Sequence, residues 1–246
     1  RLARLDPPNF RITREVLDGV FTPDTRIVVL NNPVNPAAVI FSDEELALLA
    51  EFIEGADAYA VCDEVYEHLV YDGRRHLPLM TLPGMRQRCL KIGSAGKTFS
   101  LTGWKVGYLT GCPAVLQPVA KAHQYLTFTT PPNLQTAVAL GLRLGDEYFT
   151  GLAAGLEAKR DRLVRGLEAT ALKVLPSAGS YFVVADSRPT GFAGDDVAFC
   201  RHLTSQAYRP ADVFIRGVGT ASNETHFYFG GPAVLCGGFF HLRNGG

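Results

Sequence analysis

Three groups of polar residues each follow a short apolar run in the first half of the sequence. The runs, at residues 26–30, 58–62 and 89–92, have the length and composition of buried strands. The polar residues are Asn35 after the first run, Asp63 and Tyr66 after the second, and Ser94, Lys97 and Lys105 after the third. Because ligands of open α/β sheets bind at the C-terminal ends of strands, we expect these side chains to lie together.

This set of functional groups suits one kind of cofactor chemistry. A lysine at a strand end can form a Schiff base if burial or a nearby cation lowers its pKa. Pyridoxal phosphate chemistry needs that lysine, and it needs a carboxylate that keeps the ring nitrogen protonated. It also needs donors to the ring oxygen and a cationic, hydroxyl-rich site for the phosphate. The sequence offers a candidate for each task, with Lys97 as the lysine and Asp63 as the carboxylate.

Other familiar motifs do not fit. Gly96-Lys97-Thr98 resembles the end of a P-loop, but the glycine required five residues before Gly96 is Lys91. No G-x-G-x-x-G follows a predicted strand, and neither H-E-x-x-H nor G-x-S-x-G is present. The six histidines are scattered, so we predict no metal site.

Three segments resemble the class I/II aminotransferases of fold type I. They are NNPVNPAA at 31–38, CDEVYEHLVYDG at 62–73 and GSAGKTFSLTGWKVGY at 93–108. The third is the most specific, because a lysine-centred stretch of this length rarely recurs by chance. The chain is most similar to the branch that holds the kynurenine, methionine and N-succinyldiaminopimelate aminotransferases, over most of its length up to about residue 200.

The resemblance implies catalytic roles for three residues. Lys97 would form the Schiff base with the cofactor and then carry the substrate proton. Asp63 would pair with the pyridinium nitrogen, and Tyr66 would hydrogen-bond the ring oxygen. Read without the resemblance, Tyr66 could instead be a core aromatic with a satisfied hydroxyl.

The resemblance also implies a wider set of cofactor-binding residues. They are Asn35, Asp63, Tyr66, Ser94, Lys97 and Lys105. Asn35 would share the ring oxygen with Tyr66, while Ser94 and Lys105 would hold the phosphate. Ser94 as a plain turn residue and Lys105 as a surface charge remain alternatives. Trp104 is expected in the core rather than stacked on the ring.

The expected activity is transfer of an amino group from an amino acid to a 2-oxo acid, in amino acid metabolism. A related carbon–sulfur β-lyase would use the same Lys97 and Asp63, so the motifs leave that alternative open. A truncated chain without catalysis is a third possibility. Relatives act as dimers, so the resemblance implies a homodimer.

The sequence departs from the family pattern in three places. The family's Asn-Pro-Thr-Gly is Asn35-Pro36-Ala37-Ala38 here, and the family's N-terminal part is absent. The family's C-terminal arginine, which binds the substrate carboxylate, has no clear counterpart. Arg216 and Arg243 are the nearby candidates, and neither fits the pattern. Because the match fades after about Leu203, we also consider an altered reading frame there.

Strands alternate with helices up to about residue 145, which predicts an α/β fold, with a mostly parallel sheet in a three-layer α/β/α arrangement. Residues 1–145 would form an incomplete cofactor-binding large domain, and residues 146–246 a smaller α+β domain. Ser42 and Glu45 form a predicted capping box for a helix that ends at Gly55. Further helices are expected at 114–126, 134–144, 146–169 and 195–206, and further strands at 106–109, 172–175 and 180–184.

Composition excludes several classes of function. The 246 residues carry 24 Lys and Arg against 24 Asp and Glu, and this zero net charge argues against broad binding to nucleic acid or an anionic membrane. The five cysteines include no C-x-x-C pair, which favours free thiols in a reducing compartment. We find no signal peptide or membrane span, and we expect a cytoplasmic protein.

Overall fold

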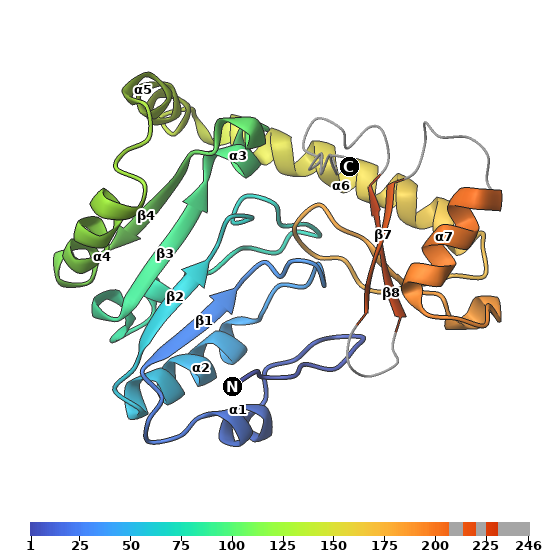
Figure 1. Ribbon diagram of the computed structural model, residues 1–246, viewed down its shortest axis with the longest axis horizontal. Helices are drawn as coiled ribbons and strands as arrows, with labels where there is room; N and C mark the ends of the chain where they lie inside the picture. The colour runs from blue at the N-terminus through green and yellow to red at the C-terminus, as the bar shows by residue number, and fades with distance from the viewer. Residues whose placement is uncertain (207–213, 220–224, 231–246) are drawn as a thin grey trace.

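Two four-stranded sheets form the framework of the computed structural model, which describes residues 1–206, 214–219 and 225–230 (Figure 1). The first sheet has the order β1-β2-β3-β4. Its strands are β1 (Ile27–Asn31), β2 (Tyr59–Asp63), β3 (Cys89–Ser94) and β4 (Gly107–Gly111). The pairs β1–β2 and β2–β3 are parallel, whereas β4 is antiparallel to β3. The α/β fold with a mostly parallel sheet is therefore confirmed.

The register brings the ends of the parallel strands to one edge. Asn31 pairs with Asp63, and Asp63 pairs with Ile92, two residues before β3 ends. The loops that carry the predicted site residues therefore leave the sheet side by side.

The helices agree closely with the expected ranges, apart from α1 and the one-turn helix α3, which no periodic pattern indicates. They are α1 (Arg14–Val20), α2 (Asp43–Gly55), α3 (Ala95–Thr98), α4 (Pro113–Leu126), α5 (Pro132–Gly141), α6 (Asp146–Glu168) and α7 (Asp196–Gln206). Short 3₁₀ turns are η1 (Leu79–Thr81), η2 (Met85–Gln87), η3 (Thr102–Trp104) and η4 (Arg188–Thr190). The capping box of α2 is confirmed, because Ser42 and Glu45 exchange side-chain and backbone hydrogen bonds.

The main apolar core lies between α2 and one face of the first sheet. Leu46 and Ile53 of α2 are fully buried there, with Leu30 of β1 among the strand residues that meet them. The opposite face is open at β1, where Ile27 and Val29 are 64% and 74% exposed. The expectation of a buried strand is wrong for these two side chains, because the described residues pack on only one side of β1.

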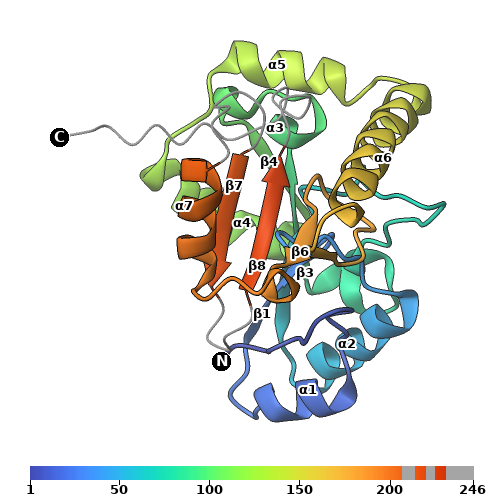
Figure 2. The ribbon, with the colours of Figure 1, turned by 90° about the vertical axis from the view of Figure 1, so that its right-hand side faces the viewer.

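The second sheet is antiparallel throughout, with the order β5-β6-β8-β7. Its strands are β5 (Lys173–Val174), β6 (Val184–Asp186), β7 (Phe214–Gly219) and β8 (Thr225–Gly230). Figure 2 shows α7 beside β7. A second apolar core joins this sheet to α6 and α7 and includes Leu167, Val183 and Phe199.

The strand expected at 180–184 begins later, at Val184. Ser180 has a φ of 61°, and this left-handed backbone conformation is incompatible with an extended strand. The shift matters for function, because it leaves Tyr181 in the irregular connection between β5 and β6.

The two sheets fall on either side of the proposed boundary between residues 145 and 146, and the division into two domains stays a prediction. Among the described residues, no helix combines the length and hydropathy that a bilayer crossing requires. The cysteines within the described ranges, Cys62, Cys89, Cys112 and Cys200, are free thiols.

Candidate active site

The predicted site residues leave the first sheet from adjacent strand ends. Asn35 lies in the loop after β1, where its backbone N–H donates to the side chain of Asn31 at 2.5 Å. Asp63 is the last residue of β2. Ser94 ends β3, and Lys97 lies in the one-turn helix α3 that follows directly. The alternation of strand and loop in the sequence is thus sufficient to bring these groups to one edge.

Lys97 is a partly buried lysine with two aromatic neighbours. Its Nζ donates a hydrogen bond to the hydroxyl of Tyr181 at 2.8 Å. The same nitrogen lies 5.3 Å from the ring centroid of Tyr181 and 5.8 Å from that of Tyr66. Burial, together with repulsion from Lys105, lowers the pKa of Lys97 to about 8, while attraction to Asp63 opposes that shift. About a tenth of the amine is therefore neutral and nucleophilic at pH 7, far more than for an ordinary lysine.

Asp63 is a partly buried carboxylate that interacts with Lys97. Burial raises the pKa of Asp63, and the adjacent Glu64 acts in the same direction. The backbone N–H of Val65, which donates to Asp63 at 3.4 Å, and the charge of Lys97 lower the pKa. A second cationic donor near this carboxylate would favour its ionised form.

Tyr66 occupies the centre of a chain of polar contacts. The residue is 1% exposed, and burial raises the pKa of its phenol. Its hydroxyl accepts a hydrogen bond from Nδ2 of Asn35 at 3.4 Å and donates one to the hydroxyl of Tyr181 at 3.3 Å. Tyr66 is thus both a core aromatic and a polar group at the site, so the two interpretations of its sequence position are compatible.

Ser94 and Lys105 mark the two ends of the connection from β3 to β4. Ser94 pairs in register with Gly107, two residues after Lys105. Lys105 is exposed and has a φ of 57°, yet its charge acts on Lys97. Ser94 lies three residues before Lys97 and the charge of Lys105 acts on Lys97, so both stay candidates for binding an anion.

Tyr181 is the residue that sequence reasoning missed. It lies 84 positions after Lys97, in the connection between β5 and β6 of the second sheet. Its ring packs edge-on against Tyr66, with the ring centroids 5.1 Å apart. The sequence Gly179-Ser180-Tyr181 indicated a turn followed by a strand, and nothing in that pattern distinguishes this tyrosine from a core aromatic.

Trp104 does not take the place that the sequence suggested, and the two C-terminal arginines are left without a role. Trp104 is 40% exposed rather than buried in the core, because it lies in the η3 turn, whose three residues are all at least partly exposed. Arg216 lies in β7, where only the backbone is described, and Arg243 lies outside the described residues. Neither is assigned a role at the site.

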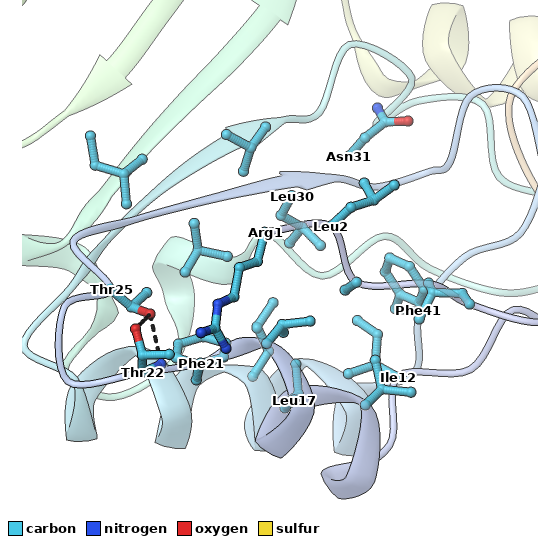
Figure 3. Close-up of a pocket in the computed structure, with 18 of the residues that line it drawn as sticks. Arg1, Leu2, Ile12, Leu17, Phe21, Thr22, Thr25, Leu30, Asn31 and Phe41 are labelled. Atoms are coloured by element: carbon cyan, nitrogen blue, oxygen red, sulfur yellow. Dashed lines mark hydrogen bonds between the residues drawn. The ribbon is translucent and has the colours of Figure 1, made fainter. Parts of the chain in front are cut away.

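A cavity of about 760 Å³ lies between the N-terminal segment and β1. Its wall is mainly apolar, with Leu17, Phe21 and Leu30 among its residues (Figure 3). Asn35 is the single predicted site residue in this wall. The cavity therefore extends away from Lys97 along the open side of β1.

The fold and the site are those of an α/β protein with a reactive lysine. The lysine, a carboxylate and a phenol lie at the ends of parallel strands of the sheet. The chain belongs to the aminotransferase class I and II family, whose model matches residues 1–213. The resemblance found in the sequence is confirmed. Membership of this family implies pyridoxal 5′-phosphate as the cofactor.

Individual relatives fall in the expected branch. The chain is 41% identical over 198 residues to the probable N-succinyldiaminopimelate aminotransferase of Mycobacterium tuberculosis, a match that covers 80% of this chain and 50% of that protein. It is 36% identical over 213 residues to the methionine aminotransferase of Escherichia coli, covering 85% and 55%.

A solved structure of the N-succinyldiaminopimelate aminotransferase from Mycobacterium tuberculosis superimposes with a TM-score of 0.82 at 36% identity. That superposition covers 91% of this chain and 59% of the other. The chain thus spans about half the length of the curated relatives it matches.

The residues present fit the implied cofactor. Burial and, after it, repulsion from Lys105 lower the pKa of Lys97, and a phosphate group beside the two lysines would offset that repulsion. Asp63 offers a carboxylate whose pKa burial has raised, and a protonated ring nitrogen would stabilise its charged form. Asn35 and Tyr66 supply an amide and a phenol in hydrogen-bond contact with each other.

Proposed function

We propose that this chain carries the cofactor-binding half of an aminotransferase that moves an amino group from an amino acid to a 2-oxo acid. The observation that carries the proposal is Lys97, whose pKa is about 8, within electrostatic reach of Asp63 in a chain of this family. When bound, pyridoxal phosphate supplies an electron sink for the bond that breaks at the substrate α-carbon.

Each residue has a defined task in this proposal. Nζ of Lys97 would hold the cofactor and, as an amine, would take the proton from the substrate α-carbon. Asp63 would hold the proton on the ring nitrogen by charge attraction.

Four other residues orient the cofactor. Tyr66 and Asn35 would hydrogen-bond the ring oxygen, and Ser94 and Lys105 would bind the phosphate. Lys105 has a second effect, because its charge keeps a larger share of Lys97 neutral.

The substrates are proposed only as a class. The names of the two relatives state activity on N-succinyldiaminopimelate and on methionine, and these activities belong to those proteins. For this chain we propose an amino acid donor and a 2-oxo acid acceptor. We further propose a homodimer in the cytoplasm, on the same family grounds.

One assay separates the three functional hypotheses. The purified chain, loaded with pyridoxal phosphate, is incubated with an amino acid, with and without a 2-oxo acid. Formation of a new amino acid that depends on the 2-oxo acid supports transfer, whereas release of pyruvate and ammonia without it supports the β-lyase. Neither product in any condition supports a chain without catalysis.

The matched variants in that assay are Lys97→Ala and Lys121→Ala. Lys121 is an exposed lysine of α4 and lies outside the proposed site. We expect the first substitution to abolish product formation and the second to leave it unchanged.

A further inference from the structure

The segment that carries Tyr181 is fixed to the loops of the first sheet by backbone hydrogen bonds. The backbone N–H groups of Ala178 and Gly179 both donate to the carbonyl of Ala38, at 2.8 and 3.0 Å. The N–H of Ser180 donates to the carbonyl of Leu69 at 2.8 Å. The segment 177–181 therefore joins the loops that follow β1 and β2, which are the loops that hold Asn35 and Tyr66.

Side chains strengthen the same junction. The hydroxyl of Tyr71, which is buried, donates to the carbonyl of Ser180. Arg160 of α6 donates to the carbonyl of Ser177 at 2.6 Å and forms a bidentate pair with Asp72, at 2.7 and 2.8 Å. Backbone and side-chain contacts thus fix the position of the segment from both of its ends.

Gly179 is required for this close approach. A Cβ added at this position would lie 3.0 Å from Cβ of Pro33 and 3.1 Å from the carbonyl oxygen of Leu69. Both atoms belong to loops that are themselves fixed, so a larger residue would push the segment outward. The position of Tyr181 therefore depends on the absence of a side chain two residues earlier.

Tyr181 in turn contacts Lys97 directly. Its oxygen accepts hydrogen bonds from Nζ of Lys97 at 2.8 Å and from the hydroxyl of Tyr66 at 3.3 Å. The two donors occupy both lone pairs of the phenol oxygen. A rotation of the lysine side chain would break the first of these contacts, so the phenol restricts the position of Nζ.

We propose that Tyr181 is the positioning residue for Lys97. The segment 177–181 holds Tyr181 in place, so Nζ of Lys97 reaches its position only when this segment is bound to the loops after β1 and β2. This inference rests on the proposed function, since it concerns the lysine that would hold the cofactor. Tyr181 acts through Nζ of Lys97, and it does so together with Tyr66, Asp63 and Lys105, the polar and charged groups that face the amine.

The proposal predicts opposite effects for two substitutions of Tyr181. Tyr181→Phe keeps the ring and its burial of the amine but removes the hydrogen-bond acceptor. Because a charged donor gains more from an acceptor than a neutral donor does, the pKa of Lys97 should fall by about half a unit or more. Tyr181→Ala removes the ring and admits water, so the pKa should rise toward the ordinary value of a lysine.

The test measures the titration of Lys97 in the 246-residue chain without cofactor. The chain is labelled briefly with acetic anhydride at a series of pH values, and the extent of acetylation at Lys97 is read by mass spectrometry. We expect a midpoint near 8 for the unsubstituted chain, a lower one for Tyr181→Phe and a higher one for Tyr181→Ala. Gly179→Ala should shift the midpoint in the same direction as Tyr181→Ala.

Tyr148→Phe is the matched control. Its hydroxyl donates to the carbonyl of Thr98 at 3.1 Å, so it contacts α3 beside Lys97 without contacting Nζ. The control should titrate like the unsubstituted chain. A Tyr181→Phe profile that superimposes on that of the unsubstituted chain, in a chain with unchanged near-ultraviolet circular dichroism, would overturn the proposal.

The labelling experiment also separates this inference from the proposed function, because it needs no cofactor. If the Lys97 titrations of Tyr181→Phe and of the unsubstituted chain superimpose in a chain that catalyses transfer, only the positioning role of Tyr181 is refuted. Shifted profiles in a chain that shows no transfer would support the positioning of Lys97 and count against the proposed function alone.

Discussion

Nζ of Lys97 lies 2.8 Å from the hydroxyl of Tyr181, although the two residues are 84 positions apart and belong to regions with separate sheets. The contact shows that the candidate site is shared between those regions. Asp63, Tyr66 and Lys97 come from the first sheet and its loops, whereas the phenol that accepts from the amine comes from the connection between β5 and β6 of the second sheet.

The depressed pKa of Lys97 predicts how attachment of pyridoxal phosphate depends on pH. Only the neutral amine attacks an aldehyde, and the pKa of this amine is about 8. Attachment should therefore accelerate about tenfold per pH unit below pH 8 and level off above it. Stopped-flow absorbance of the cofactor after mixing measures this rate. A midpoint near that of an exposed lysine would contradict the assignment.

Substituting Asp63 should separate attachment from catalysis. Asp63→Asn removes the charge that raises the pKa of Lys97, so the midpoint for attachment should move below 8. The variant also lacks the charge that holds the ring-nitrogen proton, and transfer should slow by roughly 100- to 1,000-fold. Attachment and single-turnover transfer are measured on the same sample. Asp18→Asn, at an exposed residue of α1, should change neither quantity.

Two glycine substitutions should change stability in opposite directions. The ring of Tyr108 covers Gly93, and a Cβ at Gly93 would lie 2.1 Å from Cε2 of that ring. Gly93→Ala should lower the free energy of unfolding by about 1–3 kcal/mol, because the ring or the strand must move. Gly151→Ala, at an open position inside α6, should raise it by about 0.5–1 kcal/mol. Urea denaturation followed by circular dichroism measures both free energies of unfolding. Equal changes for the two variants would count against the close contact between Gly93 and the ring of Tyr108.

The one-sided packing of β1 gives a second stability prediction. Leu46 of α2 is fully buried, and Leu46→Ala should cost about 2–5 kcal/mol of unfolding free energy. Val29 is 74% exposed on the open face, and Val29→Ala should change stability by less than about 0.5 kcal/mol. If Val29→Ala lowers the free energy of unfolding by much more than this in the same urea titration, this face of β1 is covered in solution.

The parts of the fold that local patterns encode could be predicted from the sequence. Ser42 and Glu45 specify the start of α2 through a reciprocal hydrogen-bond pattern, and the β-branched run before Asn31 specifies a strand. The strand ends then place Asp63 and Lys97 at one edge, because parallel strands leave the sheet on the same side.

The remaining features depend on contacts distant in the sequence. Seven residues with a single buried side chain, Leu17, give α1 no periodic pattern to detect. The exposure of Val29 depends on which face of the sheet other elements cover. Tyr181 reaches Lys97 only because Gly179 allows the segment to approach the loops of the first sheet, and the left-handed backbone at Ser180 sets its direction.

The central claim is that Lys97 holds the cofactor, and borohydride reduction tests it most directly. The chain is mixed with pyridoxal phosphate, reduced, digested and analysed by mass spectrometry. We expect the cofactor mass on the peptide that contains Lys97, and its loss from that peptide in Lys97→Ala. Modification of a different lysine, with the Lys97 peptide unmodified, would contradict this assignment.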